Sequence, residues 1–209
     1  GAGGSVWLTT GRLHGVGAVS ADGGNTIGLG DGGGGRVALV LTDPEADFAL
    51  WHGTNSAYGG RTRERAAAGT VYRRTADGQD SLIIDNDNSA YNYRISTLMP
   101  PGVDLNSFDD VIIRRGGVLG VRADTALDLR TFAPQWDGPA RSFLQFDGDD
   151  GVIYPDVWVI DGFTVIGCGI TNRLNSVVIG SDGVLTHLAN YDKETYKLAL
   201  TLAGDLAVR

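Results

Sequence analysis

The amino-acid sequence predicts an all-β protein, a right-handed parallel β-helix (solenoid) with loop excursions. Three observations favour this fold class. Glycine supplies 32 of the 209 residues, about twice its usual share of roughly 7%, and glycine is suited to tight bends. The acidic residues are 22 Asp and only 3 Glu; Asp favours turns, whereas Glu favours helices. Short β-branched runs also alternate with glycine-rich or Asp-Gly bends along the whole chain.

The clearest repeat is a strand, a polar corner and a second strand. It occurs as VIIRRGGVL at residues 111–119 and returns as VVIGSDGVL at residues 177–185, which is 66 positions later. Stacked layers of about 22 residues would place the two copies three layers apart on one face. The repeat therefore indicates a scaffold position whose polar corner varies, and not a duplicated active site.

Residues 1–99 are predicted to form a glycine-rich solenoid portion. Its polar bends lie at residues 22–24, 31–35 and 85–88, and residues 52–68 form a long loop that carries GTNSAYGG and three alternate arginines. The strands predicted in this portion are residues 5–10, 16–21, 36–41, 48–51, 69–72, 82–84 and 91–98.

Residues 100–209 are predicted to form a second solenoid portion that continues the first. Pro100, Pro101 and Gly102 mark the boundary, because this combination interrupts a strand. Residues 131–141 are expected to be a loop, and residues 193–202 favour strand over helix because leucines alternate there. The strands predicted in this portion are residues 111–113, 118–121, 126–129, 143–146, 157–160, 163–166, 177–179, 198–202 and 206–208. The alternative fold is a pair of antiparallel β-sandwich domains divided at the same place.

The charge of the chain bears on its partners. The formal net charge is −8 and the pI is about 4.7, which disfavours nucleic acid or an anionic membrane as a partner. No apolar run is as long as a membrane helix, and no signal peptide is recognisable. Because the chain begins at Gly1 and its only methionine is Met99, we expect a processed product or a segment of a longer protein.

Four stretches carry a resemblance to a known group of proteins. They are GAGGSVWLTTGRLHGVGAVSADGG at residues 1–24, GGGGRVALVL at 32–41, VVIGSDGVLTHLAN at 177–190 and YKLALTLAGDLAVR at 196–209. The sequence resembles the glycine-rich β-helical repeat segments of very large secreted or surface-displayed bacterial adhesin-like proteins. The resemblance implies a right-handed parallel β-helix outside the cell with a structural or adhesive role, and it brings no catalytic residues.

Two functional hypotheses follow. The first is a non-enzymatic extracellular module, a segment of a long surface or filament-forming protein that acts by extension, adhesion or self-association. Its partners would be flanking segments of the same chain, identical subunits or surface glycans. The second is a carbohydrate-active β-helix that binds polysaccharide or acts on it as a hydrolase or lyase, because parallel β-helices host such enzymes.

Candidate site residues are few. Asp147, Asp149 and Asp150 cluster between glycines and offer the oxygen ligands that calcium prefers, and Asp85 with Asp87 forms a second acidic bend of this kind. Neither bend matches the EF-hand loop.

The tryptophan, histidine and cysteine side chains are further candidates for a functional role. Trp51 and Trp136 adjoin irregular loops and are candidates for glycan contact, whereas Trp158 lies within an apolar strand and is expected in the core. The three histidines have no metal-site spacing, and Cys168 has no partner cysteine and no reactive motif around it, so structural roles are expected for them.

Overall fold

The structure contains β-strands and one short 3-10 helix. The computed structural model describes residues 1–27, 30–62, 65–89, 95–190 and 193–209. Within these residues there is no α-helix, and η1 (Leu105–Ser107) is a single 3-10 turn, so the prediction of an all-β fold is confirmed. No helix in the described part of the chain is long and apolar enough to cross a membrane.

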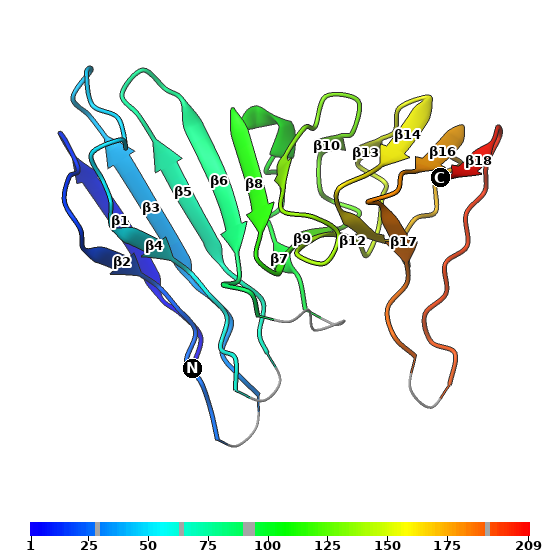
Figure 1. Cartoon of the computed structure of the whole chain (residues 1–209), viewed down its shortest axis with the longest axis horizontal. Helices are drawn as coiled ribbons and strands as arrows, with labels where there is room; N and C mark the ends of the chain where they lie inside the picture. Colours follow the sequence, from blue (N-terminus) through cyan, green and yellow to red (C-terminus); the bar gives the residue numbers. More distant parts are fainter. Residues whose placement is uncertain (28–29, 63–64, 90–94, 191–192) are drawn as a thin grey trace.

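Most strands belong to three sheets (Figure 1). The largest sheet, here the long sheet, contains β1 (Ser5–Thr10), β3 (Arg36–Leu41), β5 (Thr70–Arg74), β6 (Asp80–Asp85), β8 (Asp110–Arg114) and β11 (Gln135–Trp136), in that order. The second sheet has the order β17 (Val184–Thr186), β15 (Thr164–Ile166), β12 (Ser142–Phe146), β9 (Gly117–Val121) and β7 (Thr97–Leu98). The third sheet contains β14 (Val157–Ile160), β16 (Ser176–Ile179) and β18 (Leu206–Val208).

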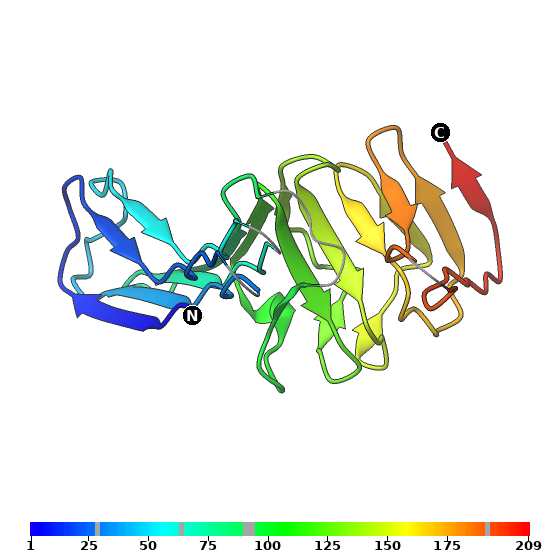
Figure 2. The ribbon, with the colours of Figure 1, turned by 90° about the horizontal axis from the view of Figure 1, so that it is seen from below.

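Two smaller pairs complete the strands. They are β2 (Ala18–Ser20) with β4 (Thr54–Ser56), and β10 (Leu127–Asp128) with β13 (Val152–Ile153). The view from below (Figure 2) shows β2 and β4 facing the N-terminal end of the long sheet, while the later strands stack towards β18 at the other end of the molecule.

Strand pairing between described residues is parallel in every ladder except that between β5 and β6. The alternative of two antiparallel sandwiches is therefore wrong. The register also confirms the prediction from the 66-residue repeat: Val118 pairs with Phe143, Phe143 with Thr164, and Thr164 with Val184. The GVL parts of the two copies thus lie three layers apart in one sheet.

The antiparallel hairpin between β5 and β6 reverses the chain within the long sheet. Val71 pairs with Ile83 and Tyr72 with Leu82 across it. Before the hairpin, Val71 and Leu39 lie on the face of the sheet that packs against the N-terminal core. After the hairpin, Leu82 lies on the opposite face, which packs against the C-terminal core. At the hairpin the strand direction reverses, and the face of the sheet that packs against a core also changes. New strands are still added at the same edge of the sheet. Because both reversals occur together, the connections keep the same hand on both sides of the hairpin.

Two of the three hydrophobic clusters in the described chain follow from this change of face; the third, smaller cluster consists of Val118, Phe143, Ile166 and Leu188. The N-terminal core lies between the β1–β3–β5 part of the long sheet and the β2–β4 connections; its buried members are Ala21, Val37, Leu39, Ala57, Val71 and Ile83. The larger C-terminal core fills the space between the three main sheets, and its least exposed members include Ile84, Leu105, Ile113, Leu119, Leu144, Phe146, Ile160 and Val165.

Glycines bring backbones together beside the N-terminal core. A Cβ atom added to Gly69 would overlap the carbonyl oxygen of Gly35, and one added to Gly35 would overlap that of Gly4. Arg36 N donates to Gly4 O at 2.9 Å and Thr70 N donates to Gly35 O at 3.1 Å across the same positions. These layers pack by backbone contact, which explains why glycine recurs just before β1, β3 and β5.

Several predicted strands are confirmed and several are corrected. The strands β1, β3 and β14 have the predicted bounds, and β18 is confirmed. Residues 48–50 form a turn, because Asp47 Oδ1 accepts a hydrogen bond from Ala49 N at 2.9 Å. The loop predicted at 52–68 contains β4, and the loop predicted at 131–141 contains β11.

Two further predictions concern weaker segments. Residues 198–202 are not a strand; among them only Leu202 makes a single bridge, to Leu174. Of the strand predicted at 91–98, residues 91–94 lie outside the described residues, and β7 covers Thr97–Leu98. The change of core occurs at the β5–β6 hairpin, whereas the domain boundary at Pro100 and Pro101 stays a prediction.

Candidate functional site

The face formed by the long sheet is interrupted between β11 and β14. On the opposite side of the same layers β12 pairs directly with β15, but β11 pairs only with β8, and β14 pairs only with β16, among the described residues. The layers are therefore in contact on one side and separated on the other. A cleft of about 370 Å³ opens at this separation.

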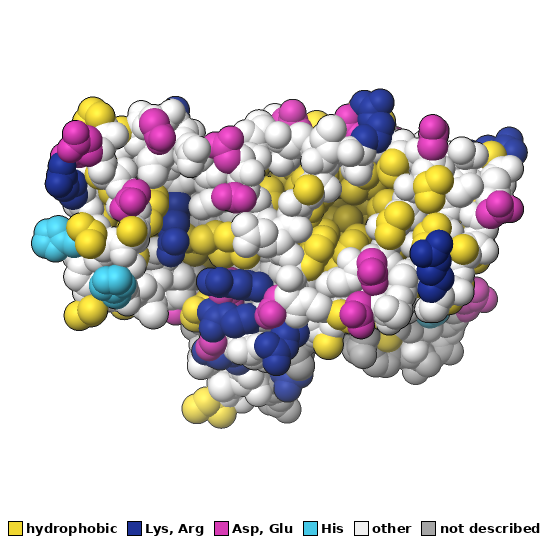
Figure 3. All heavy atoms as spheres, turned by 45° about the horizontal axis from the view of Figure 1, so that its top comes forward, with side chains coloured by type: hydrophobic (Ala, Val, Ile, Leu, Met, Phe, Trp, Pro, Cys, Tyr) yellow, Lys and Arg dark blue, Asp and Glu magenta, His cyan; other side chains and the backbone are white. Residues whose placement is uncertain are grey.

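Aromatic and aliphatic side chains line this cleft, here the aromatic cleft. Trp158, Phe163 and Leu144 are the most buried of the lining side chains and form its floor, Trp158 being 4% exposed. Figure 3 shows hydrophobic side chains gathered in a hollow over the C-terminal half. The remaining lining residues are Leu129, Arg130, Phe132, Trp136, Pro155, Val157, Val159 and Asp161.

The rings that line the cleft are held in place by one another. Trp136 stacks on Phe163, with ring centroids 4.1 Å apart and an angle of 9° between the planes. Trp158 meets Phe146 and Tyr154 edge to face at 5.8 and 5.4 Å. Stacked and edge-to-face pairs restrict ring rotation, so the cleft presents a preformed apolar surface.

Polar groups lie at the rim of the cleft. Arg130 donates to both carboxylate oxygens of Asp128, at 2.8 and 2.6 Å; these hydrogen bonds lower the pKa of Asp128 and raise that of Arg130. The exposed Asp161 accepts a hydrogen bond from Asp182 N at 3.0 Å. The cleft thus combines aromatic surfaces with one guanidinium and one carboxylate, as small-molecule sites do.

Of the two tryptophans predicted to contact glycans, Trp136 lines the cleft and Trp51 does not. Trp51 bridges Gly15 in the N-terminal half, and its indole N–H donates to Asn55 Oδ1 at 3.0 Å. Its ring also lies against Gly17. The two residues therefore do not form one site. Trp158, expected in the core, is buried there and also contributes to the cleft floor.

The acidic turn predicted to bind calcium contains three differently placed carboxylates. Asp149 is 1% exposed, and it accepts hydrogen bonds from Thr171 N and Oγ1, Asn172 N and Tyr154 Oη. Asp147 accepts from Gln145 Nε2 at 3.0 Å, and Asp150 is exposed. Because Asp149 is already saturated with donors, a calcium ion here would depend on Asp147 and Asp150. Calcium binding at this turn stays a prediction.

The second acidic bend is paired with arginines. Asp85, 7% exposed, accepts from Arg114 Nε at 2.8 Å and from Arg115 Nη2 at 2.7 Å. Arg115 also donates to Asp87 at 3.0 Å and to Tyr58 Oη at 2.7 Å. The two arginines of the first VIIRRGGVL copy therefore tie one layer to the preceding layer. No cluster of three or more His, Cys, Asp or Glu side chains arranged to hold a metal occurs in the described ranges.

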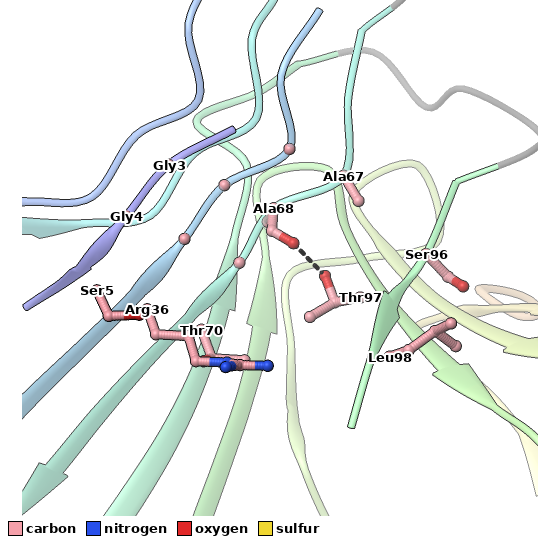
Figure 4. A pocket seen from close by; sticks show the side chains of 14 residues that line it. Gly3, Gly4, Ser5, Arg36, Ala67, Ala68, Thr70, Ser96, Thr97 and Leu98 are labelled. Carbon is pink, nitrogen blue, oxygen red and sulfur yellow. Dashed lines mark hydrogen bonds between the residues drawn. The ribbon is translucent and has the colours of Figure 1, made fainter. Parts of the chain in front are cut away.

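A second hollow, of about 350 Å³, lies where the N-terminal ends of β1, β3 and β5 meet β7 (Figure 4). Its lining is mostly glycine and alanine backbone, with Arg36, Ser96 and Thr97 as the principal polar side chains. Thr97 donates its hydroxyl to Ala68 O at 2.7 Å, the bond drawn in Figure 4. Since aromatic rings are absent from this lining, it offers less binding surface than the aromatic cleft.

Several cleft residues were not anticipated from the sequence. Phe132 and Arg130 lie in the loop LRTFAPQW beside the predicted Trp136, and the two aromatic residues of this loop were a usable signal. Phe163 and Asp161 come from the next layer, and only the strand register brings them to the same place.

Comparison with known proteins adds no relative. The chain matches no protein-family model, no curated protein and no solved structure.

Proposed function

We propose that this chain is a non-enzymatic structural and adhesive module of a secreted or surface-displayed bacterial protein, and that it binds glycans in the aromatic cleft. The observation that carries the proposal is the preformed cleft between β11 and β14, lined by Trp136, Phe132, Trp158 and Phe163. The aliphatic C–H face of a pyranose ring packs on an aromatic ring, and its hydroxyl groups need polar partners at the edge. Asp161 and Arg130 lie where such partners are needed.

The scaffold proposed is a right-handed parallel β-helix. Nearly all ladders are parallel, and the connections keep one hand on both sides of the hairpin; parallel crossovers are right-handed in about 98% of cases. The resemblance to glycine-rich adhesin-like repeats agrees with this scaffold. A solenoid of this kind gives length with few residues per layer, which suits extension from a surface.

Flanking segments of the same chain or identical subunits are the proposed protein partners. Among the described residues β1 pairs only with β3 and β18 only with β16, so each has one free edge. A free strand edge is a template for further pairing. Light scattering would test self-association. We expect the average molar mass to rise with protein concentration, and a monomer at all concentrations would contradict the proposal.

Binding is favoured over hydrolysis at the cleft. Glycoside hydrolysis generally uses two carboxyl groups placed across the scissile bond, and Asp161 is the only carboxylate in the described cleft lining. The alternative function, a polysaccharide hydrolase or lyase, would therefore use other residues, and the acidic turn of Asp147 and Asp149 is the candidate. Turnover of an acidic or neutral polysaccharide that is lost in Asp147→Asn, and in an Asp149→Asn variant shown to remain folded, would favour the enzyme.

A glycan array probed with wild type, Trp136→Ala and Trp7→Ala tests the proposal. Trp136 lines the cleft, and Trp7 is a matched surface tryptophan, 73% exposed and outside it. We expect Trp136→Ala to lose at least about tenfold in affinity, equivalent to roughly 1.4 kcal/mol, as aromatic anchors commonly do. Trp7→Ala should bind like wild type. Equal binding by all three proteins would reject the cleft as the glycan site.

A further inference from the structure

The two copies of the 66-residue repeat stand beside equivalent aspartates of the preceding layer. Asp85, at the end of β6, pairs with Arg114 of the first copy. Asp161 directly follows the last pair of the β14–β16 ladder and therefore stands opposite Gly180 of the second copy. Gly180 lies 66 positions after Arg114. The chain thus repeats one arrangement, in which an aspartate at a strand end faces the polar corner of the next layer.

The two aspartates differ in the groups that meet their charge. Asp85 accepts from both arginines of the first copy, at 2.8 and 2.7 Å. Asp161 Oδ1 accepts from the backbone N–H of Asp182 at 3.0 Å. Asp161 makes no ion pair with any described residue, Arg209 included, which follows β18 one strand further along the same row. The carboxylate of Asp85 is therefore neutralised by two cations, whereas that of Asp161 keeps its negative charge.

Asp161 is also the charge that the aromatic cleft leaves unpaired. Arg130 is the one basic residue in the described lining, and it donates to both carboxylate oxygens of Asp128, at 2.8 and 2.6 Å. The charges of this pair offset each other, which leaves Asp161 as the remaining charge of the lining. The cleft therefore presents a negative group beside its aromatic rings.

The carboxylate of Asp161 is held in place by the corner at residues 180–182. Asp182 N donates to Asp161 Oδ1, and Gly162 N donates to Asp182 O at 2.8 Å, so two hydrogen bonds join the two bends. A Cβ atom added to Gly180 would overlap the Asp161 carboxylate, which packs directly on that glycine. The second carboxylate oxygen, Oδ2, accepts no hydrogen bond from the described residues. This oxygen is therefore available to a ligand.

We infer that Asp161 makes the aromatic cleft select glycans that carry a free, protonated amino group, such as glucosamine units, and reject glycans built from uronates. The inference rests on the glycan binding proposed above for this cleft. An ammonium group is matched by a carboxylate, which only accepts hydrogen bonds, and by the face of a tryptophan ring; Trp136 supplies such a ring in the same lining. A uronate carboxylate would meet a like charge at Asp161, which lowers affinity.

Isothermal titration calorimetry with three oligosaccharides of equal length tests this selection. They are β-1,4-linked oligoglucosamine, its fully N-acetylated form and oligogalacturonate, of which the first two share one backbone and differ at the amino group. Mildly acidic pH keeps the amino groups protonated, and the salt concentration is held constant because salt screens exposed charges. We expect wild type to bind oligoglucosamine at least about threefold more tightly than the N-acetylated form, as for a partly exposed ion pair. Oligogalacturonate should bind most weakly.

Two variants assign the preference to Asp161. Asp161→Asn keeps the size of the side chain and removes its charge, so it should bind both glucosamine oligomers about equally and the N-acetylated one as tightly as wild type does. Asp205→Asn is the matched control, because Asp205 is exposed and outside the cleft lining and its replacement changes the net charge by the same amount. It should keep the wild-type preference. A preference that survives in Asp161→Asn, or that falls equally in Asp205→Asn, would overturn the inference.

The same titrations separate this inference from the proposed function. If wild type bound the amino and N-acetylated oligomers equally and Trp136→Ala bound neither, glycan binding in the cleft would stand and selection by Asp161 would be rejected. If wild type bound neither oligomer, the inference would again be rejected, and the glycan array would decide the proposed function by itself. Both outcomes are measured on wild type and therefore do not depend on the folding of Asp161→Asn.

Discussion

Asp149 offers the most direct test of how the layers hold together. Its buried carboxylate accepts from two backbone N–H groups, of Thr171 and Asn172, and from two hydroxyl groups, of Thr171 and Tyr154. The carboxylate therefore joins the 147–151 turn to the start of the next layer. Replacing it with alanine removes all four acceptor contacts at once, and Asp149→Asn removes roughly half of them.

The expected loss in the free energy of unfolding depends on which of the four donors can find another acceptor. Hydroxyl groups can turn towards other acceptors, but the two backbone N–H groups cannot. Each buried donor left unpaired costs about 1–3 kcal/mol, so Asp149→Ala should lower the free energy of unfolding by about 2–6 kcal/mol. Asp149→Asn keeps one carbonyl oxygen and should lose about 1–3 kcal/mol.

Urea denaturation followed by tryptophan fluorescence measures these changes. The neighbouring Asp150→Ala is the control, because Asp150 is exposed, and it should change the free energy of unfolding by less than about 0.5 kcal/mol. The m-value should stay constant in all three variants. If Asp149→Ala were as stable as Asp150→Ala, the carboxylate would not join the two layers and the argument would fail.

The same residue predicts a pH dependence. Burial alone would raise the pKa of Asp149, but the hydrogen bonds from Thr171, Asn172 and Tyr154 outweigh it and lower the pKa below its ordinary value. A carboxyl whose folded pKa is depressed contributes stability above its unfolded pKa, about 3.9, and loses it as pH falls through the folded value. Wild type should therefore lose more stability than Asp149→Asn as the pH falls from about 5 to below that folded value.

Three further predictions concern the packing and the acidic turns. Gly69→Ala should lower the free energy of unfolding by about 1–3 kcal/mol, because the new Cβ meets backbone; Gly4→Ala, whose Cβ would meet nothing within 4 Å, should be neutral in the same urea titration. Asp85→Asn should cost about 1–3 kcal/mol by removing the anion between two partly exposed arginines, and the loss should shrink in an Arg115→Gln background. If calcium binds at the 147–150 turn through Asp147 and Asp150, calcium added after EDTA should raise Tm in a saturable way; an unchanged Tm would reject the calcium hypothesis.

Much of the architecture was accessible from local patterns. A β-branched run between glycine bends was enough to predict β1 and β3, since such a run fits a strand buried on one or both faces. The 66-residue spacing predicted the stacking of Val118 and Val184, because equal layers return the chain to the same face.

The reversal at the β5–β6 hairpin was not predicted, although Asp77-Gly78 is a familiar hairpin signal. The signal is local, whereas the consequence depends on which face the following connection covers. Both faces of β6 carry apolar side chains: Leu82 and Ile84 lie on one face and Ile83 lies on the other. The hydrophobic pattern of such a strand does not indicate which of its faces packs against a core.

The aromatic cleft itself was not predicted; among its residues only Trp136 was a predicted glycan contact, because it is a large ring beside an irregular loop. Its stacking partner Phe163 lies 27 positions later in the sequence, and their meeting depends on the broken pairing between β11 and β14. The role of Asp149 was also hidden, because its donors at Thr171 and Asn172 come from the next layer. Contacts between layers need the register, which no single segment contains.

The central claim is that glycans bind in the aromatic cleft, and the indole N–H signals of the four tryptophans test it most directly. Each tryptophan gives one cross-peak in a proton–nitrogen spectrum, recorded while an oligosaccharide selected by the array is titrated. Trp136 and Trp158, which line the cleft, should shift together in a saturable way, while Trp7 and Trp51 should not move. Shifts confined to Trp7 or Trp51, or none at all at saturation, would contradict the claim.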